Sequence, residues 1–441
     1  MKSKDQSIDR SNHSAGNEDL EALIRYDESR LSMKSLLREI QTASDSQYHS
    51  RSLPLSVIRY RNTIDYILTK SLGQLDFNEL NSFDRNFLRL AIYELRWLNV
   101  NLDHFKSKYP QITSRYEEVL KRSLVFDLDA TVRKLPLVNQ YSLKYSHPSF
   151  IVQTLLDNMS SEDCIHLLKS NNSSRVYYLR PNKLHEGYST FINSLTGVKL
   201  EPDSLVPEIY RINTGIDEVV KSALFREGKI LIQDKASILV VNALDPHPGQ
   251  KVWDACAAPG MKTQLIAERM KGHGCLVASD VYPHRVKMAR ELSKKLNTEH
   301  TEWTHSDATR PEFRDADKIL IDAPCTSTGI LQSYPSFKWR LNKEALFALM
   351  AIQNKILDGI LSAYSERPGT EIVYATCSIL PHEGESQIDS ALERHNIELM
   401  DPLDYGDFGY PKFKCTQKVR RVFPHKHECS GFFISRLRIK H

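Results

Sequence analysis

Short apolar segments alternate with longer amphipathic ones from Lys229 to the C-terminus, and this alternation constrains the fold more than any other feature. The short segments predict strands and the longer ones predict helices. The predicted strands are 251–256, 275–280, 301–304, 318–322 and 371–376, and the predicted helices are 262–271, 283–296 and 343–364. This order predicts an α/β domain with a mainly parallel, doubly wound sheet. Ligands bind to such sheets outside the carboxyl ends of the strands.

The N-terminal part of the chain has a different pattern. Residues 20–145 repeat apolar side chains at intervals of three or four, which predicts an all-α domain. Its clearest helix is 85–98, with Asp84 as the expected N-cap. Three arginines lie off the apolar face of this helix, at positions 85, 89 and 96. The side chains on the apolar face are Phe87, Leu88, Ala91, Ile92, Leu95 and Leu98.

Four parts are predicted along the chain. Polar residues 1–18 are expected to be a disordered tail, and residues 19–145 to be the helical domain. Residues 146–228 are predicted to form a small α+β subdomain, and residues 229–441 the α/β domain. The elements expected in the subdomain are a helix, a strand and a second helix, at 149–170, 175–179 and 186–196.

Composition narrows the classes of protein. The longest apolar run, 345–352, has eight residues, whereas a membrane span needs roughly 18. The first 20 residues lack the apolar core of a signal peptide. The seven cysteines include no CxxC pair, which argues against a disulfide framework or a zinc ribbon. We therefore expect a cytoplasmic protein with no membrane contact and no metal site.

Positive charge is concentrated in two regions, although the net charge is only +4. Residues 51–145 carry 15 basic and 10 acidic side chains, and residues 412–441 carry 9 and 1. Regions of this kind suggest contact with a polyanion such as a nucleic acid. A solvated charged surface is the alternative reading.

One predicted strand runs into a turn of small residues, Asp-Ala-Cys-Ala-Ala-Pro-Gly-Met-Lys-Thr, at 254–263. Small residues let a ligand approach the backbone closely. The turn has neither the GxGxxG pattern of dinucleotide sites nor the adjacent Gly and Lys of a P-loop. It therefore suits a nucleoside ligand without a pyrophosphate, such as S-adenosylmethionine. At the ends of the next two strands, Asp280 could bind both ribose hydroxyls and Asp307 the adenine amino group.

Two cysteines also follow predicted strands: Cys325 in an Asp-Ala-Pro-Cys turn and Cys377 in an Ala-Thr-Cys-Ser turn. A cysteine thiolate that adds to carbon 6 of cytosine makes carbon 5 nucleophilic, and carbon 5 can then accept a methyl group. Asp322 is the candidate acid near ring nitrogen 3. Lys262 could hold the base and lower a thiol pKa. The alternatives are small buried side chains and, with His425, His427 and Cys429, metal ligands.

Together these motifs resemble the Nop/Sun family of RNA cytosine-5 methyltransferases and, within it, the RsmB-like members. The motifs of the α/β domain are DACAAPGMKT (254–263), DAPCTSTGI (322–330), ATCSILPHEGE (375–385), FPHKHECSGFF (423–433) and IQDKAS (232–237). Those similar to the family's small RNA-binding subdomain are HPSF (147–150) and YLRPN (178–182). The segment 75–98 is similar to the NusB-type helical domain at the N-terminus of RsmB.

The resemblance implies a fold, a cofactor and a role for each site residue. The fold is a NusB-like all-α domain, a small α+β subdomain and a Rossmann-like α/β methyltransferase domain. Cys377 corresponds to the nucleophile and Cys325 to the cysteine that assists breakdown of the adduct. Asp322 and Lys262 would also reach the target base. The residues implied to bind S-adenosylmethionine are Cys256, Ala257, Ala258, Pro259, Gly260, Met261, Lys262, Asp280, Asp307 and Asp322.

The chain departs from the family pattern at several places. The usual Gly-Gly-Lys contains Met261, the Ser-Gly-Thr-Gly after the first cysteine reads Thr-Ser-Thr-Gly, and the usual Glu-Asn-Glu contains Gly384. Ser333 and Ser336 occupy positions where the family usually has Arg and Asp. These last two changes put RNA binding and the choice of substrate in question.

The resulting prediction is an S-adenosylmethionine-dependent enzyme that methylates carbon 5 of a cytosine in RNA. Ribosomal RNA is the expected partner, with transfer RNA as the alternative, and no oligomer is indicated. A non-catalytic RNA-binding assembly factor is the competing function, and a nicotinamide oxidoreductase is disfavoured by the missing Gly-rich fingerprint. A DNA cytosine methyltransferase would place its nucleophile in the Pro-Cys turn, at Cys325 rather than Cys377.

Overall fold

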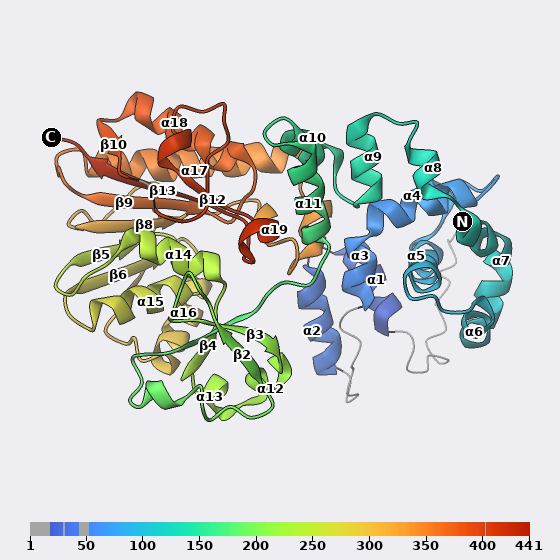
Figure 1. The fold of residues 1–441 in the computed structure, drawn as a ribbon, viewed down its shortest axis with the longest axis horizontal. Coiled ribbons are helices and arrows are strands. Elements are labelled where there is room, and N and C mark those ends of the chain that lie inside the picture. The colour runs from blue at the N-terminus through green and yellow to red at the C-terminus, as the bar shows by residue number, and fades with distance from the viewer. Residues whose placement is uncertain (1–17, 30, 44–52, 402) are drawn as a thin grey trace, which may run out of the picture. The chain divides into compact units, whose positions relative to one another are not determined.

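The computed structural model describes residues 18–29, 31–43, 53–401 and 403–441. The chain forms two compact units (Figure 1). The helical unit runs up to Leu156 and also contains Tyr334–Arg340, and the second unit comprises Asp157–Ser333 and Leu341–His441. The tail expected at 1–18 lies outside the described residues except for Glu18, which begins the first helix. The domain boundaries expected at 145/146 and 228/229 stay predictions.

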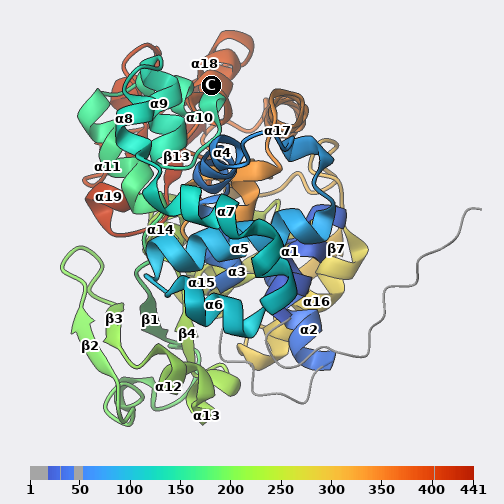
Figure 2. The same ribbon diagram turned by 90° about the vertical axis from the view of Figure 1, so that its right-hand side faces the viewer.

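Ten α-helices are described in the helical unit, together with a short 3₁₀ turn at Phe77–Glu79. Helix α5 lies at its centre and contacts α1, α3, α4 and α7 (Figure 2). The helices are α1 (Glu18–Glu28), α2 (Met33–Ala43), α3 (Leu53–Arg59), α4 (Arg61–Ser71), α5 (Ser82–Trp97), α6 (Leu102–Lys108), α7 (Pro110–Val125), α8 (Leu128–Val132), α9 (Leu137–Lys144) and α10 (Ser149–Leu156).

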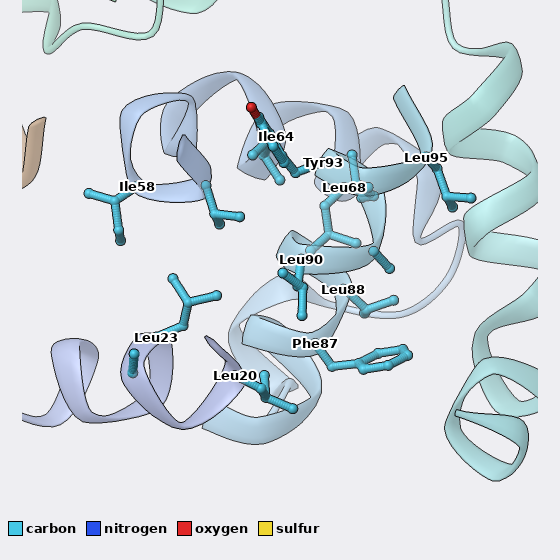
Figure 3. Packing of buried hydrophobic residues seen from close by; sticks show 14 of the residues in the cluster. Leu20, Leu23, Ile58, Ile64, Leu68, Phe87, Leu88, Leu90, Tyr93 and Leu95 are labelled. Atoms are coloured by element: carbon cyan, nitrogen blue, oxygen red, sulfur yellow. The ribbon is translucent and has the colours of Figure 1, made fainter. Parts of the chain in front are cut away.

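The apolar periodicity read from the sequence builds the core of this unit. Figure 3 shows Phe87, Leu88 and Leu95 of α5 among side chains from α1, α3 and α4. Leu98, which was expected on the same face, is the C-cap of α5 and is exposed. The helix begins earlier than predicted, because Asn81 rather than Asp84 is the N-cap and accepts a hydrogen bond from the Asp84 amide at 2.8 Å.

One arginine of α5 is buried although it lies off the apolar face. The Arg89 side chain is 1% exposed and forms ion pairs with Asp65 at 2.6 Å and Asp27 at 2.7 Å. A buried charge needs partners of this kind, because leaving it unpaired costs several kcal/mol, roughly 3–5. The apolar pattern could not indicate these partners, since both carboxylates come from other helices.

A segment from the C-terminal half of the chain completes the helical unit. In this segment, Tyr334–Arg340, the Trp339 Nε1 donates to the Ile58 carbonyl at 2.6 Å. The buried Lys338 Nζ donates to the Ser146 carbonyl at 3.0 Å, and the Tyr26 hydroxyl donates to the Ser336 carbonyl at 2.9 Å. Ser336, one of the departures from the family pattern, is therefore packed inside the helical unit.

The second unit contains a four-stranded antiparallel sheet in the order β2-β3-β1-β4. Its strands are β1 (Tyr178–Pro181), β2 (Lys199–Pro202), β3 (Tyr210–Thr214) and β4 (Ile230–Ile232), and the helices nearby are α11 (Ser161–Asn171), α12 (Ile216–Lys221) and α13 (Ala223–Arg226). The helix expected at 149–170 is two helices, because α10 ends at Leu156 and Ser160 caps α11.

The prediction of a helix at 186–196 is wrong. Only Tyr188–Thr190 forms a 3₁₀ turn, and the amides of Thr190, Phe191 and Leu195 donate to the carbonyl three residues earlier. Phe191 is buried, and Ile192 and Leu195 pack beside it. Successive tight turns bury these side chains at the same spacing as a helix face, so periodicity alone could not separate the two structures.

The large sheet has the order β11-β12-β13-β9-β8-β5-β6-β7, with β10 paired to β13. The five strands from β9 to β7 are parallel, as predicted, and the C-terminal strands add antiparallel pairs. The strands are β5 (Lys251–Asp254), β6 (Cys275–Asp280), β7 (Glu302–His305), β8 (Lys318–Asp322), β9 (Glu371–Thr376), β10 (Ile397–Leu399), β11 (Asp407–Phe408), β12 (Arg420–Val422) and β13 (Phe432–Ile439).

Helices cover both faces of this sheet (Figure 1). Leu320 of β8 packs in a core with α14 and α15, whereas Ile319 and Ile321 pack in a core with α17 and α18. This division follows from the alternation of side chains along a strand. The helices are α14 (Lys235–Leu244), α15 (Met261–Met270), α16 (Pro283–Lys295), α17 (Lys343–Ala363), α18 (Glu385–Arg394) and α19 (Pro424–His427).

Helix α17 has the length and the hydropathy that a membrane span requires. Among the described residues it is the one helix that meets this test, which core helices also meet. Its buried side chains, including Leu357 and Ile360, pack against the sheet.

Replacing Trp339 with alanine should destabilise the helical unit by about 2 kcal/mol, because the ring packs on its core and its N–H satisfies the Ile58 carbonyl. Hydrogen exchange of the α1 and α3 amides in the full chain would report the loss. Val125→Ala, at a position that is 83% exposed, is the control and should change stability by less than about 0.5 kcal/mol. Unchanged protection of α1 and α3 in Trp339→Ala would contradict the assignment of this segment to the core.

Candidate active site

The carboxyl ends of the parallel strands gather the residues singled out in the sequence. Strands β5, β6 and β8 end at Asp254, Asp280 and Asp322, and Cys377 directly follows β9. Because neighbouring parallel strands end at the same edge of a sheet, these side chains meet there. The structure therefore brings these residues together at one edge of the sheet, and their roles in a site stay predictions.

The small-residue turn after β5 fits closely between its neighbours. The Ala255 amide donates to the Leu320 carbonyl at 2.9 Å, and the Ala257 amide donates to the Ser279 carbonyl at 2.8 Å. Gly260 has a φ of +107°, and a Cβ atom there would lie 3.1 Å from the Trp303 ring. Met261, a departure from the family pattern, follows this turn as the first residue of α15.

A cavity of about 1070 Å³ opens at this edge of the sheet. Its wall includes five residues of the cofactor set inferred from the sequence, namely Cys256, Ala258, Asp280, Asp307 and Asp322, together with Cys325 and Cys377. The other members of that set do not line the cavity: Ala257, Pro259 and Gly260 lie in the turn after β5, and Met261 and Lys262 begin α15. The volume accommodates a nucleoside cofactor together with a base.

The two aspartates expected to hold the nucleoside already have partners. Asp280 forms an ion pair with Arg285 at 2.9 Å and accepts a hydrogen bond from the Tyr282 amide at 3.0 Å. Asp307 is exposed and accepts from the Thr309 amide at 2.9 Å, as turn aspartates commonly do. Both still line the cavity, and their oxygens retain lone pairs for a ligand.

The two thiols lie in contact at the cavity wall. The sulfurs of Cys325 and Cys377 are 3.3 Å apart and form no disulfide, and the Ser327 hydroxyl lies 3.5 Å from the Cys377 sulfur. Ser327 was not assigned from the sequence, and its place two residues after Cys325 was the only available signal. A thiol that donates to a second sulfur favours the thiolate form of its acceptor.

The surroundings push the pKa values of the two thiols in opposite directions. The hydrogen bond from Cys325 lowers the pKa of Cys377 and outweighs burial, with further contributions from Ser327 and Lys262. The same hydrogen bond, together with burial, raises the pKa of Cys325 well above its ordinary value. Cys377 is therefore the thiol of the pair that loses its proton more readily.

Lys262 and Asp322 form an ion pair beside Cys377. The Lys262 Nζ donates to the Asp322 carboxylate at 2.7 Å, and the two side chains are 13% and 30% exposed. Burial alone would lower the pKa of Lys262, but the Asp322 carboxylate outweighs burial and raises it. The lysine therefore keeps its proton next to the acid expected to face ring nitrogen 3.

A buried ion pair that the sequence did not indicate supports the Cys377 turn. Arg421 and Glu385 are both fully buried, and the Arg421 Nε lies 2.7 Å from a Glu385 oxygen. Arg421 also donates to the Ser378 carbonyl at 3.1 Å. The basic C-terminal segment thus includes at least one cation that serves structure rather than a polyanion.

The C-terminal motif also reaches the Cys325 turn. The Gly431 amide donates to the Gly329 carbonyl at 2.8 Å, and the Gly329 amide donates to the Cys377 carbonyl at 2.9 Å. A Cβ atom at Gly329 would lie 1.8 Å from the Gly431 carbonyl oxygen. Three motifs that are far apart in sequence therefore meet around the thiols, and only glycine fits at this crossing.

The departure at Gly384 has a steric explanation. A Cβ atom there would lie 2.7 Å from the Phe433 ring and 2.8 Å from an Arg421 nitrogen. The usual asparagine would therefore collide with its neighbours in this chain.

The YLRPN motif contributes a buried network rather than a free cation. Arg180 is fully buried and pairs with Glu268 at 2.7 Å, and the Asn182 side chain donates to the Gly228 and Leu296 carbonyls. The Arg180–Glu268 pair attaches the small sheet to α15, and Asn182 connects it to Leu296 at the end of α16. His425, His427 and Cys429 do not gather as ligands, and no group of three or more metal-binding side chains occurs among residues 18–29, 31–43, 53–401 and 403–441.

Comparison with known proteins identifies the family. The 16S rRNA methyltransferase RsmB/F family matches residues 241–438, and the NusB family matches residues 10–105. Over 302 residues the chain is 32% identical to the ribosomal RNA small subunit methyltransferase B of Photorhabdus laumondii, covering 67% of each protein. The chain belongs to the RsmB-like family of S-adenosylmethionine-dependent RNA cytosine-5 methyltransferases. This confirms the resemblance, the fold class and the cofactor inferred from the sequence.

Two further similarities agree with this family. The chain is 28% identical over 327 residues to the human 28S rRNA (cytosine(4447)-C(5))-methyltransferase, and the match spans 68% of this chain but only 39% of that relative. The crystal structure of a methyltransferase homolog protein from Pyrococcus horikoshii aligns with a TM-score of 0.61 and 26% identity, covering 70% of this chain and all of the other.

The buried carboxyl group of Asp254 makes the stability of the fold depend on pH. Burial raises the pKa of Asp254 to about 7, although the Thr263 hydroxyl donates to it at 2.7 Å. A carboxyl group whose folded pKa lies above its unfolded value stabilises the fold at low pH, and this stability is lost as pH rises through 7. Asp254→Asn should therefore be more stable than the wild type at pH 8, by up to about 4 kcal/mol, and the gap should close near pH 4.

Urea unfolding of both proteins at several pH values measures this difference. Asp217→Asn, at an exposed position in the first turn of α12, is the matched control and should follow the wild type throughout. A constant difference between Asp254→Asn and the wild type from pH 4 to pH 8 would show that Asp254 titrates as an ordinary carboxyl group.

Proposed function

We propose that this protein methylates carbon 5 of a cytosine in ribosomal RNA through a covalent adduct with Cys377. The observation that carries the proposal is the contact of two thiols at 3.3 Å, at the wall of a cavity that also contains Asp322. Names of relatives support ribosomal RNA, since they describe methyltransferases of small-subunit and 28S rRNA. The match of the N-terminal region to the NusB family adds a helical domain of the kind found in RsmB.

Each residue has a defined part in the proposed reaction. The Cys377 thiolate donates an electron pair to carbon 6, and the Asp322–Lys262 pair supplies a proton toward ring nitrogen 3. When bound, S-adenosylmethionine supplies an electrophilic methyl group. Cys325, which holds the proton of the thiol pair, donates it to the Cys377 sulfur as the bond to carbon 6 breaks. The Cys325 thiolate left behind accepts the carbon 5 proton, and the proton at ring nitrogen 3 returns to the Asp322–Lys262 pair, so the aromatic ring is restored.

The residues around the cavity are proposed to bind the cofactor as the family pattern implies. Ala255, Cys256 and Ala258 leave room for a nucleoside against the backbone, and Asp280 and Asp307 offer acceptors for ribose and adenine. The target cytosine must leave its stack to reach Cys377 inside the cavity, so a flipped or single-stranded base is expected. We place this reaction in the cytoplasm.

Two substitutions distinguish the roles of the thiols. Cys377→Ala should abolish both methylation and the covalent RNA adduct, because it removes the nucleophile. Cys325→Ala should accumulate adduct, because release of Cys377 is blocked. Denaturing gels of the protein with RNA and S-adenosylmethionine measure the adduct. Cys275→Ala, at the opposite end of β6, is the control and should retain activity. Adduct accumulation in Cys377→Ala instead would reverse the assignment.

The RNA class can be determined directly. Labelled S-adenosylmethionine should transfer its methyl group to ribosomal RNA in preference to transfer RNA, and bisulfite sequencing should show one modified cytosine. Transfer to transfer RNA alone would identify the alternative substrate. Cofactor binding without transfer to either RNA would indicate that the substrate is a preassembled particle. Absence of both methyl transfer and cofactor binding would support a non-catalytic RNA-binding role.

A further inference from the structure

Glu383 is a buried carboxylate that joins the two cysteine turns. It is 0% exposed and lies in the 3₁₀ turn Pro381–Glu383, six residues after Cys377. One of its oxygens accepts the Thr326 amide at 2.8 Å and the Gln353 side-chain amide at 2.9 Å. The other accepts the Thr326 hydroxyl. Thr326 directly follows Cys325, so this carboxylate holds the Cys325 turn from the Cys377 side.

Hydroxyl groups extend this connection across both turns. The Thr328 hydroxyl lies 3.0 Å from the Ser378 hydroxyl and accepts the Ile379 amide at 3.1 Å. The Thr326 hydroxyl lies 3.3 Å from that of Thr328. The two turns are thus linked by a chain of side chains that ends on Glu383, and the sulfurs are held in contact by it.

The negative charge of Glu383 has no cationic partner. The groups that donate to its carboxylate, from Thr326 and Gln353, are neutral, and in the described part of the chain no Lys, Arg or His side chain forms an ion pair with it. Glu385, only two residues away, is paired with Arg421. A buried anion without a counter-ion exerts a strong field on nearby ionisable groups, because little solvent screens it.

We propose that Glu383 is a positioning residue that fixes the Cys325 turn against the Cys377 turn and keeps the single proton of the thiol pair on Cys325. The Cys377 sulfur is then the thiolate whose electron pair attacks carbon 6. Glu383 touches neither the base nor the cofactor in this role. The inference deepens the proposed covalent function and rests on it.

The surrounding groups agree with this distribution of the proton. Glu383 contributes to the raised pKa of Cys325, after the Cys377 hydrogen bond and burial. Burial and the charge of Glu383 also raise the pKa of Tyr374, whose hydroxyl donates to the Glu383 carbonyl at 3.0 Å. Other titratable groups near the pair are Asp322 and Lys262, beside Cys377, and His382, beside Glu383.

The test follows the alkylation of Cys325 by iodoacetamide as a function of pH, in the full-length Cys377→Ser protein. Without Cys377, burial and Glu383 should still hold the midpoint of the alkylation profile above the ordinary value for cysteine of about 8.5. Adding Glu383→Gln should lower this midpoint by about one pH unit, which is a tenfold change in thiolate fraction. Burial affects the maximal rate but not this difference, since glutamine has nearly the same size.

Controls separate charge from fold. Glu371→Gln removes a paired carboxylate at the other end of β9 and should leave the midpoint unchanged. Circular dichroism and cofactor binding show whether each variant is folded. If Glu383→Gln does not fold, the alkylation profile of Cys377→Ser alone still tests the proposal. A midpoint for Cys325 at the ordinary cysteine value of about 8.5 would overturn it. An unchanged midpoint in folded Glu383→Gln would overturn it as well.

The readout needs no RNA and no methyl transfer, so failure of the proposed function would be recognised separately by the adduct assay. In the otherwise wild-type enzyme, Glu383→Gln should lower kcat about tenfold and leave the KM for RNA unchanged, because the thiolate fraction changes but the RNA contacts do not.

Discussion

The contact between the Cys325 and Cys377 sulfurs depends on the register of two adjacent parallel strands. β8 and β9 pair so that Asp322 lies opposite Ala375, and each strand then turns sharply at the same edge of the sheet. Hydrogen bonds between the turns, from the Gly329 amide to the Cys377 carbonyl and through the side chain of Thr328, prevent them from separating. A shift of one residue in this pairing would move one thiol by about 3.3 Å and turn side chains to the other face.

Much of the fold could be predicted because local patterns coincide with tertiary structure. The strands β6, β8 and β9 have the predicted bounds, since each is a short apolar run ended by a polar residue. For the same reason, the sequence could predict that the residues at the carboxyl ends of these strands lie together at one edge of the sheet. The segment 186–196 misled the prediction because its apolar spacing comes from tight turns. Patterns record which side chains are buried, but not the hydrogen bonds that bury them.

The support of the site could not be predicted from spacing. Glu383 lies in a turn and Arg421 in the short strand β12, and both are charged, which usually indicates exposure. Their burial depends on partners that are distant in sequence, such as Thr326 for Glu383 and Glu385 for Arg421. Likewise, Ser333 and Ser336 looked like lost RNA contacts, but Ser336 is packed within the helical unit. Only the contacts around a residue show whether a charged side chain, or a departure from the family pattern, serves the structure.

The passage of residues 334–340 through the helical unit bears on how such enzymes can be recombined. The core against which Trp339 and Lys338 pack is encoded by two distant stretches of the gene. Suppose that the N-terminal half of one relative is joined to the C-terminal half of another. The segment corresponding to 334–340 would then come from the second relative and pack into the core of the first. Exchange of the helical unit between relatives therefore succeeds only as a two-piece transplant, and the inserted piece must travel with its own α1, α2 and α3.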